Sequence, residues 1–258
     1  MEQVERRKYL IEYLLSELKQ PAVIPDDINE QKRLLRALVN VRMPKPVSKE
    51  FLQIQDEYLK EKLQRRGITD IADITPVAPD IYLWQGDITT LKCDGIVNAA
   101  NSRMLGCFCP NHGCIDNAIH TFAGIQLRQE CAEIMRAQGR EELTGRAKIT
   151  KAYNLPCKCV IHTVGPIVYG TLNKQHEKQL ADCYRSCLAL ADENGLKSVA
   201  FCCISTGEFH FPNDKAAEIA VKTVKEYKTR TQSKIKIIFN VFKDNDYAIY
   251  SGILQTSK

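Results

Sequence analysis

The sequence contains no long apolar run, and this absence limits the classes of protein to which it can belong. No stretch of about 18 or more apolar residues occurs in the 258 residues, so we predict no membrane-spanning helix. The first 20 residues carry acidic side chains among their apolar positions, and no hydrophobic stretch there ends in a small-residue cleavage site. We therefore expect a cytoplasmic protein with no membrane partner.

Long runs of one charge are also missing. The formal net charge is +5, and no run of Lys or Arg is long enough to form an arm that binds nucleic acid. We expect no nucleic-acid partner, whereas an anionic small ligand is compatible with this charge. Internal repeats and low-complexity tracts are absent too, and a hydrophobic content of 44% is enough for a substantial core.

Eleven cysteines are present, which in a small secreted protein would indicate disulfide bonds. This chain is neither small nor predicted to be exported, so reduced thiols and metal ligands are the better expectation. Four candidate ligands fall within eight residues: Cys107, Cys109, His112 and Cys114. Thiolate and imidazole are preferred zinc ligands, so the segment predicts a metal site. Reduced cysteines in a loop are the alternative.

Residues 1–72 are predicted to form an N-terminal helical extension. Apolar residues recur at helical spacing in three segments, which end before Pro21, before Pro44 and near Gly67. Amphipathic stripes of this kind are most simply explained by packing against the rest of the chain. We also predict that these helices border the ligand cleft.

Residues 73–258 alternate between short β-rich runs and helical segments. The predicted strands are 81–85, 95–99, 149–154, 160–164, 198–204 and 235–239. The predicted helices are 115–138, 174–194, 213–230 and 245–255. This alternation implies an α/β fold with a mixed or largely parallel sheet between helices. Ligands bind such sheets at the carboxyl ends of the strands.

Three polar residues follow or end two of the predicted strands: Asp87, Asn98 and Asn101. Carboxamides both donate and accept hydrogen bonds, which suits sugar hydroxyls, and a carboxylate accepts from an exocyclic amine such as that of adenine. An isolated Asn or Asp after a strand more often caps a turn. The indication therefore depends on their occurring together.

These residues stand in four ordered blocks that resemble the macrodomain family: Gly86-Asp-Ile-Thr89, Asn98-Ala-Ala-Asn101, Ile115-Asp-Asn-Ala-Ile-His120 and Ser205-Thr-Gly-Glu-Phe-His-Phe-Pro212. The resemblance implies a three-layer α/β/α sandwich that binds ADP-ribose across the strand ends. It implies these ligand-binding residues: Asp87, Ile88, Asn101, Ser205, Thr206, Gly207, Glu208 and Phe209.

In that resemblance Asp87 holds the adenine, and Asn98 and Asn101 address the distal ribose. The loop at 205–211 wraps the diphosphate with backbone N–H groups, and Phe209 packs against the distal ribose. Glu208 is unexpected there, because a carboxylate repels a diphosphate unless it points to solvent.

The cysteine segment stands where many macrodomains carry a glycine run, and it resembles the zinc-containing macrodomains of bacterial origin. Their Cys-x4-His-x-Cys pattern is matched by Cys107, His112 and Cys114, which implies one Zn²⁺ ion beside the ribose pocket. Cys109 matches no ligand of that family, and a four-ligand site is the competing assignment. A closed four-ligand site is usually structural, whereas three ligands leave one coordination position open.

The resemblance implies a protein mono-ADP-ribosylhydrolase that uses zinc to cleave the bond between mono-ADP-ribose and an acidic side chain, releasing ADP-ribose. The implied catalytic residues are Asn98, Asn101 and Asp116. Asp116 would orient a water or act as base, although its position equally suits a helix cap. The implied partner is an ADP-ribosylated protein, in particular a lipoyl carrier of the glycine-cleavage H type.

Two alternatives use the same cleft. The first is a non-catalytic reader that binds ADP-ribosylated proteins without cleaving them. The second is an enzyme that deacetylates O-acetyl-ADP-ribose and holds zinc in a purely structural role. Open zinc coordination would distinguish the hydrolase from the reader, and turnover of both substrates by metal-free and zinc-loaded protein would rank the possibilities.

Overall fold

The chain begins with three helices, α1 (Gln3–Glu17), α2 (Ile28–Val41) and α3 (Lys49–Arg66), as the sequence predicts. The computed structural model describes residues 1–19, 21 and 23–256. Side-chain caps fix two of the starts: Asp27 accepts from the backbone of Asn29 and Glu30, and Ser48 accepts from Phe51. The apolar stripes of all three helices pack into one core, which Ile125 of the following domain joins.

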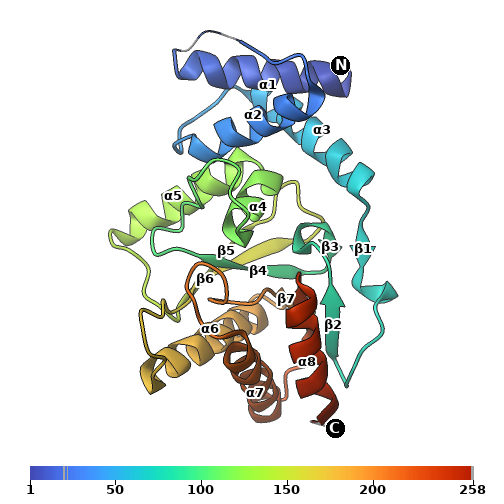
Figure 1. Ribbon diagram of the computed structural model, residues 1–258, viewed down its shortest axis with the longest axis vertical. Helices are drawn as coiled ribbons and strands as arrows, with labels where there is room; N and C mark the ends of the chain where they lie inside the picture. The colour runs from blue at the N-terminus through green and yellow to red at the C-terminus, as the bar shows by residue number, and fades with distance from the viewer. Residues whose placement is uncertain (20, 22, 257–258) are drawn as a thin grey trace.

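A six-stranded sheet forms the centre of the molecule (Figure 1). Its order is β2 (Ile81–Gln85), β8 (Lys236–Val241), β7 (Ser198–Phe201), β4 (Gly95–Ala100), β6 (Cys159–Val164) and β5 (Ala147–Lys151). All neighbours are parallel except β5 and β6. The predicted mixed sheet is therefore confirmed. A small second sheet pairs β1 (Thr69–Asp70) with β3 (Leu91–Lys92).

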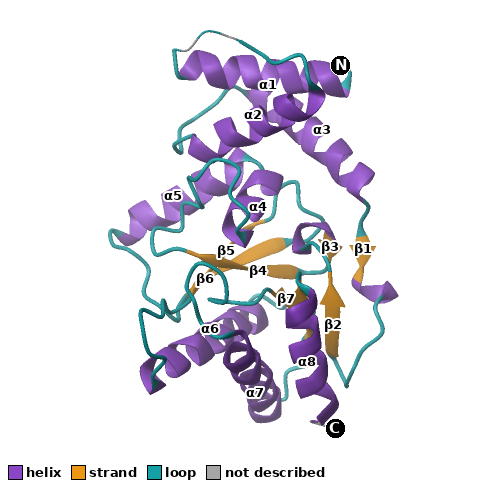
Figure 2. Ribbon diagram, in the orientation of Figure 1, coloured by secondary structure: helices purple, strands orange, loops and turns teal. Residues whose placement is uncertain are grey.

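Helices cover both faces of the six-stranded sheet (Figure 2). One face carries α4 (Ile115–Ala123) and α5 (Ile125–Gln138), and the extension lies beyond them. The other face carries α6 (Lys174–Glu193), α7 (Asn213–Thr231) and α8 (Asp244–Thr256). The three-layer α/β/α arrangement is thus confirmed. Over the described residues, every helix is too short or too polar to cross a membrane.

Three predicted elements differ in extent from the observed ones. The strand predicted at 149–154 is β5, which ends at Lys151. The helix predicted at 115–138 is two helices, because Gly124 has φ of 101° and interrupts the helical backbone. The strand predicted at 198–204 ends at Phe201, because the chain turns where the Thr206 hydroxyl donates to the Cys203 carbonyl. The hydrophobic pattern continues through Gly124 and past Phe201, so it does not predict either break.

Arg128 of α5 fastens the extension to the sheet-bearing part of the chain. Its guanidinium donates to the carbonyls of Asn40 and Arg42, at 2.8 and 2.6 Å, and to that of Leu105, at 2.7 Å. The last carbonyls of a helix have no partner within the helix, and Arg128 supplies one at the end of α2. It also lies over the Phe108 ring at 4.3 Å.

We predict that Arg128→Ala lowers the free energy of unfolding by about 3 kcal/mol, because it leaves several buried carbonyls without a donor. Urea unfolding of the purified protein measures this loss. Arg136→Ala, at an exposed position on the same helix, is the matched control and should change stability by less than about 0.5 kcal/mol. Equal effects of the two substitutions would contradict the anchoring role.

Candidate active site

The fold brings the four sequence blocks to one edge of the sheet. Parallel strands end at the same edge, so the segments that follow β2, β4 and β7 meet there. Asp87 follows β2 and caps the short helix η2 (Ile88–Thr90). Asn98 and Asn101 lie at the end of β4, and residues 205–209 follow β7. The strand order places the 205–209 loop between Asp87 and the two asparagines.

The centre of the site is a buried network around Asp116, in the first turn of α4. The Asn98 amide donates to Asp116 Oδ1 at 2.8 Å and to His162 Nδ1 at 3.1 Å. The Asn101 amide donates to Asp116 Oδ2 at 3.3 Å. Burial raises the pKa of Asp116 to about 6, against the hydrogen bond from Asn98 and the charge of Arg128, which lower it. All three predicted catalytic residues are therefore in contact.

Behind this network lies a second buried group of ionisable side chains. The ligand atoms of His120, Cys131 and His162 are within 4.8 Å of one another. His162 is the cross-strand partner of Asn98, and its Nε2 lies 2.9 Å from the Thr150 hydroxyl. Burial lowers the pKa of His162 to about 4, so the ring is neutral near pH 7 and accepts from Asn98. His162 supports the Asn98 amide, and all three residues of the group are buried.

The segment at 106–114 folds so that three of its four candidate ligands converge. The ligand atoms of Cys107, His112 and Cys114 lie within 4.8 Å of one another, and Cys109 is outside this group. Cys107 Sγ and His112 Nδ1 are 3.7 Å apart. Tetrahedral zinc, with bonds of about 2.3 Å to sulfur and 2.0–2.1 Å to nitrogen, needs a separation of about 3.6 Å. The donor set fits zinc in type and in spacing.

Two further contacts hold these donors in place. Cys114 is the N-cap of α4, and its sulfur accepts from the Asn117 backbone at 3.4 Å. His112 Nε2 faces the Glu208 carboxylate at 3.5 Å. Histidines that bind metals usually offer their second nitrogen to a carboxylate, so Glu208 has a place beside His112. Its side chain is 68% exposed, which removes the conflict expected between this carboxylate and a diphosphate.

The 205–209 loop, which is predicted to wrap the diphosphate, is held by backbone hydrogen bonds. Ser205 has φ of 66°, and its carbonyl accepts from Phe211 N at 3.0 Å. The Phe209 carbonyl accepts from Val168 N at 2.9 Å. These bonds close the loop into a tight turn, with Gly207 and Glu208 exposed at its tip.

Sequence reasoning missed two arginines of the extension. Arg36 of α2 donates to the His112 carbonyl at 2.9 Å and to Asn117 Oδ1 at 2.7 Å. Arg66 of α3 pairs with Asp87 and lies over the Phe122 ring at 3.9 Å. These contacts place the extension beside residues predicted to bind the metal and the ligand, and that it borders the ligand cleft stays a prediction. The local sequence does not predict either contact, because the partners of both arginines lie in other elements, 76 and 81 residues away for Arg36 and 21 for Arg66.

Similar proteins indicate the family to which this chain belongs. The sequence model described as Macro domain matches residues 97–220. A protein-ADP-ribose hydrolase of Treponema medium is 59% identical over 260 residues, covering 98% of this chain and all of the relative. A protein-ADP-ribose hydrolase of Staphylococcus aureus (strain MSSA476) is 52% identical over 258 residues, covering 97% of each chain. This chain belongs to the macrodomain family.

Solved macrodomains share the fold. The Trypanosoma brucei macrodomain in complex with ADP-ribose is 32% identical, with a TM-score of 0.66, and the match covers 85% of this chain and 94% of that one. The three-layer arrangement and the family implied by the four blocks are thus established, and the two relatives named above carry the names of enzymes.

Gly106 gives a direct test of how this macrodomain positions its cysteine segment. Its φ is +79°, and a Cβ there would lie 2.8 Å from the buried His120 ring. We predict that Gly106→Ala lowers the free energy of unfolding by about 2 kcal/mol or more. Gly113→Ala is the matched control in the same segment, because a Cβ there meets nothing within 4 Å. Chemical denaturation of both variants tests this, and equal stabilities would contradict the packing described.

Proposed function

We propose that this macrodomain hydrolyses the bond between mono-ADP-ribose and an acidic side chain of a protein and releases ADP-ribose, with one zinc ion held by Cys107, His112 and Cys114. The observation that carries the proposal is the position of these donors. Cys114 caps the helix whose first turn holds Asp116, so the three donors adjoin the Asn98, Asn101 and Asp116 network.

The donor set is favourable for chemistry because it has three members. When bound, zinc supplies a Lewis acid with an open position for an oxygen of the distal ribose or of the ester. Cys109, the fourth candidate, is exposed and outside the group. This arrangement supports an open site over the closed Cys3His alternative.

The residues of the chain itself bind and orient the substrate. Asn98 Oδ1 is buried without a hydrogen-bond partner among the described atoms, which suits a ribose hydroxyl as its missing donor. Asn98 and Asn101 hold both oxygens of Asp116. A fixed carboxylate of this kind orients a water or removes a proton from it. Backbone N–H groups of the 205–209 loop bind the diphosphate, and Asp87 binds the adenine amine.

The target is an ADP-ribosylated protein. The relatives named protein-ADP-ribose hydrolase support this substrate class. A lipoyl carrier of the glycine-cleavage H type is the specific partner suggested by the family resemblance.

Release of ADP-ribose tests the activity. Zinc-loaded protein should release ADP-ribose from an Asp/Glu-modified substrate faster than from a Ser-modified one. Asn101→Ala and Cys107→Ala should lower the rate about a hundredfold or more, because each removes a group that acts on the reacting ribose. Thermal unfolding checks that both variants fold. Binding of ADP-ribose without release from either substrate would identify a reader.

The number of zinc ligands has its own test. Metal analysis should find one zinc per chain in the unsubstituted protein and in Cys109→Ser, because Cys109 is outside the donor group. Cys107→Ser and His112→Ala should lose the metal, since each removes one of three ligands. Loss of zinc from Cys109→Ser would establish a closed site and contradict the Lewis-acid role.

A further inference from the structure

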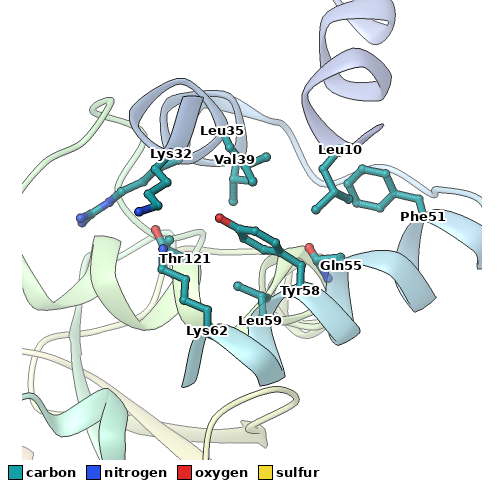
Figure 3. Close-up of a pocket in the computed structure, with 11 residues that line it drawn as sticks. Leu10, Lys32, Leu35, Val39, Phe51, Gln55, Tyr58, Leu59, Lys62 and Thr121 are labelled. Carbon is teal, nitrogen blue, oxygen red and sulfur yellow. The ribbon is translucent and has the colours of Figure 1, made fainter. Parts of the chain in front are cut away.

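A pocket lies between the extension and α4, outside the residues that the proposed function uses for the nucleotide. Its apolar wall comes from α1, α2 and α3. Three cationic side chains line the same space: Lys32, Arg36 and Lys62. Lys32 and Lys62 extend from α2 and α3 toward Thr121 of α4 (Figure 3). We call this space the extension pocket.

The three cations of the extension pocket have no ion-pair partner among the described residues. Among the described residues, no carboxylate forms an ion pair with Lys32 or Lys62. Arg36 donates to a backbone carbonyl and an amide oxygen, both of which are neutral. The Asp87 carboxylate forms its ion pair with Arg66. The pocket therefore presents several positive charges to any group that enters it.

Lys62 is partly buried beside other cations. Burial and then the charges of Arg66, Arg36 and Lys32 lower its pKa to about 8. Its ammonium lies 5.0 Å from the centre of the Phe122 ring, the same ring on which Arg66 stacks. Lysines often cover apolar surface with their stems and leave the ammonium in water. Lys62 differs, because its ammonium lies over the Phe122 ring among other cations that repel it.

We propose that the extension pocket binds an acidic side chain of the modified protein, close in sequence to the residue that carries ADP-ribose. The inference rests on the proposed function. An anion would relieve the repulsion among the three cations and accept charge-assisted hydrogen bonds from them. The apolar wall suits the methylene groups of a peptide side chain better than it suits a small hydrated ion.

The position of the extension pocket favours the polypeptide over the nucleotide. Arg36 lines the pocket and also binds the His112 carbonyl, so the pocket adjoins the segment where the proposed bond is cleaved. The phosphates of ADP-ribose are assigned to the 205–209 loop, which follows β7 at the sheet edge. The adenine is assigned to Asp87, which Arg66 contacts at the other end of the extension. At the Arg36 end, the part of the substrate left to bind is the protein that carries the modified side chain.

Two matched peptides test the proposal. Both carry ADP-ribose on the same Glu, one flanked by Asp and Glu and the other by Asn and Gln. The unsubstituted protein should show a kcat/KM about tenfold higher for the acidic peptide, as expected for one charge-assisted contact. The Lys32→Gln, Lys62→Gln double variant should lose this preference. Arg33→Gln, Lys60→Gln, at exposed positions of the same two helices, should keep it.

The outcomes separate this inference from the proposed function. Equal rates on both peptides would overturn the extension pocket and leave the hydrolase intact. If neither peptide releases ADP-ribose, the hydrolase fails, and the affinities for the two peptides then become the readout: a preference for the acidic peptide that the double variant loses still supports the pocket.

Two controls identify any other occupant. Affinity for free ADP-ribose should be unchanged in the double variant, and a loss would place the lysines at the nucleotide and overturn the peptide assignment. Inorganic phosphate that binds the unsubstituted protein but not the double variant, with no peptide preference, would identify a small-anion site and equally overturn it. Thermal unfolding of each variant confirms that the comparison is between folded proteins.

Discussion

The arrangement of the site depends on the hydrogen bonds of the buried Asp116 carboxylate. A buried charge is costly unless hydrogen bonds stabilise it, and here Asn98 and Asn101 donate to both of its oxygens. These hydrogen bonds therefore hold the end of β4 and the first turn of α4 in a fixed relative position. Because Cys114 caps the same helix, the same hydrogen bonds also fix the cysteine segment against the strand end. The His162 ring behind Asn98 completes the support from the neighbouring strand.

The parts of this arrangement that could be predicted from the sequence are those encoded locally. Cys107, His112 and Cys114 stand within eight residues, so a single turn can bring their donors together, and the strand ends follow from hydrophobic pattern and from the rule that parallel strands end at one edge. Glu208 shows the limit of such reasoning. Its proximity to His112 arises because two loops from different strands meet, and neither sequence block indicates the other.

The contributions of the extension could not be predicted for the same physical reason. Arg36 and Asn117 are 81 residues apart, and Arg128 reaches the end of α2 across 86 to 89 residues. Single arginines on amphipathic helices resemble ordinary solvated positions, and only the packed structure shows which carbonyls and carboxylates they meet. The stripe of leucines correctly indicated that the helices pack against something, but it carried no information about the polar contacts at its border.

These contacts make the extension part of the site at both of its ends. Arg66 meets Asp87, on the side predicted for the adenine, and Arg36 meets the metal-ligand segment. The two ends differ in electrostatic balance. Arg66 has a carboxylate partner and serves to position it, whereas Lys32 and Lys62 between them have none among the described residues. A cluster of unpaired cations lowers stability by mutual repulsion, and a protein tolerates such a cost most readily where a ligand relieves it. The charge that the extension leaves uncompensated is thus best understood as complementary to the substrate, which on this reasoning is recognised through its polypeptide as well as through its ADP-ribose.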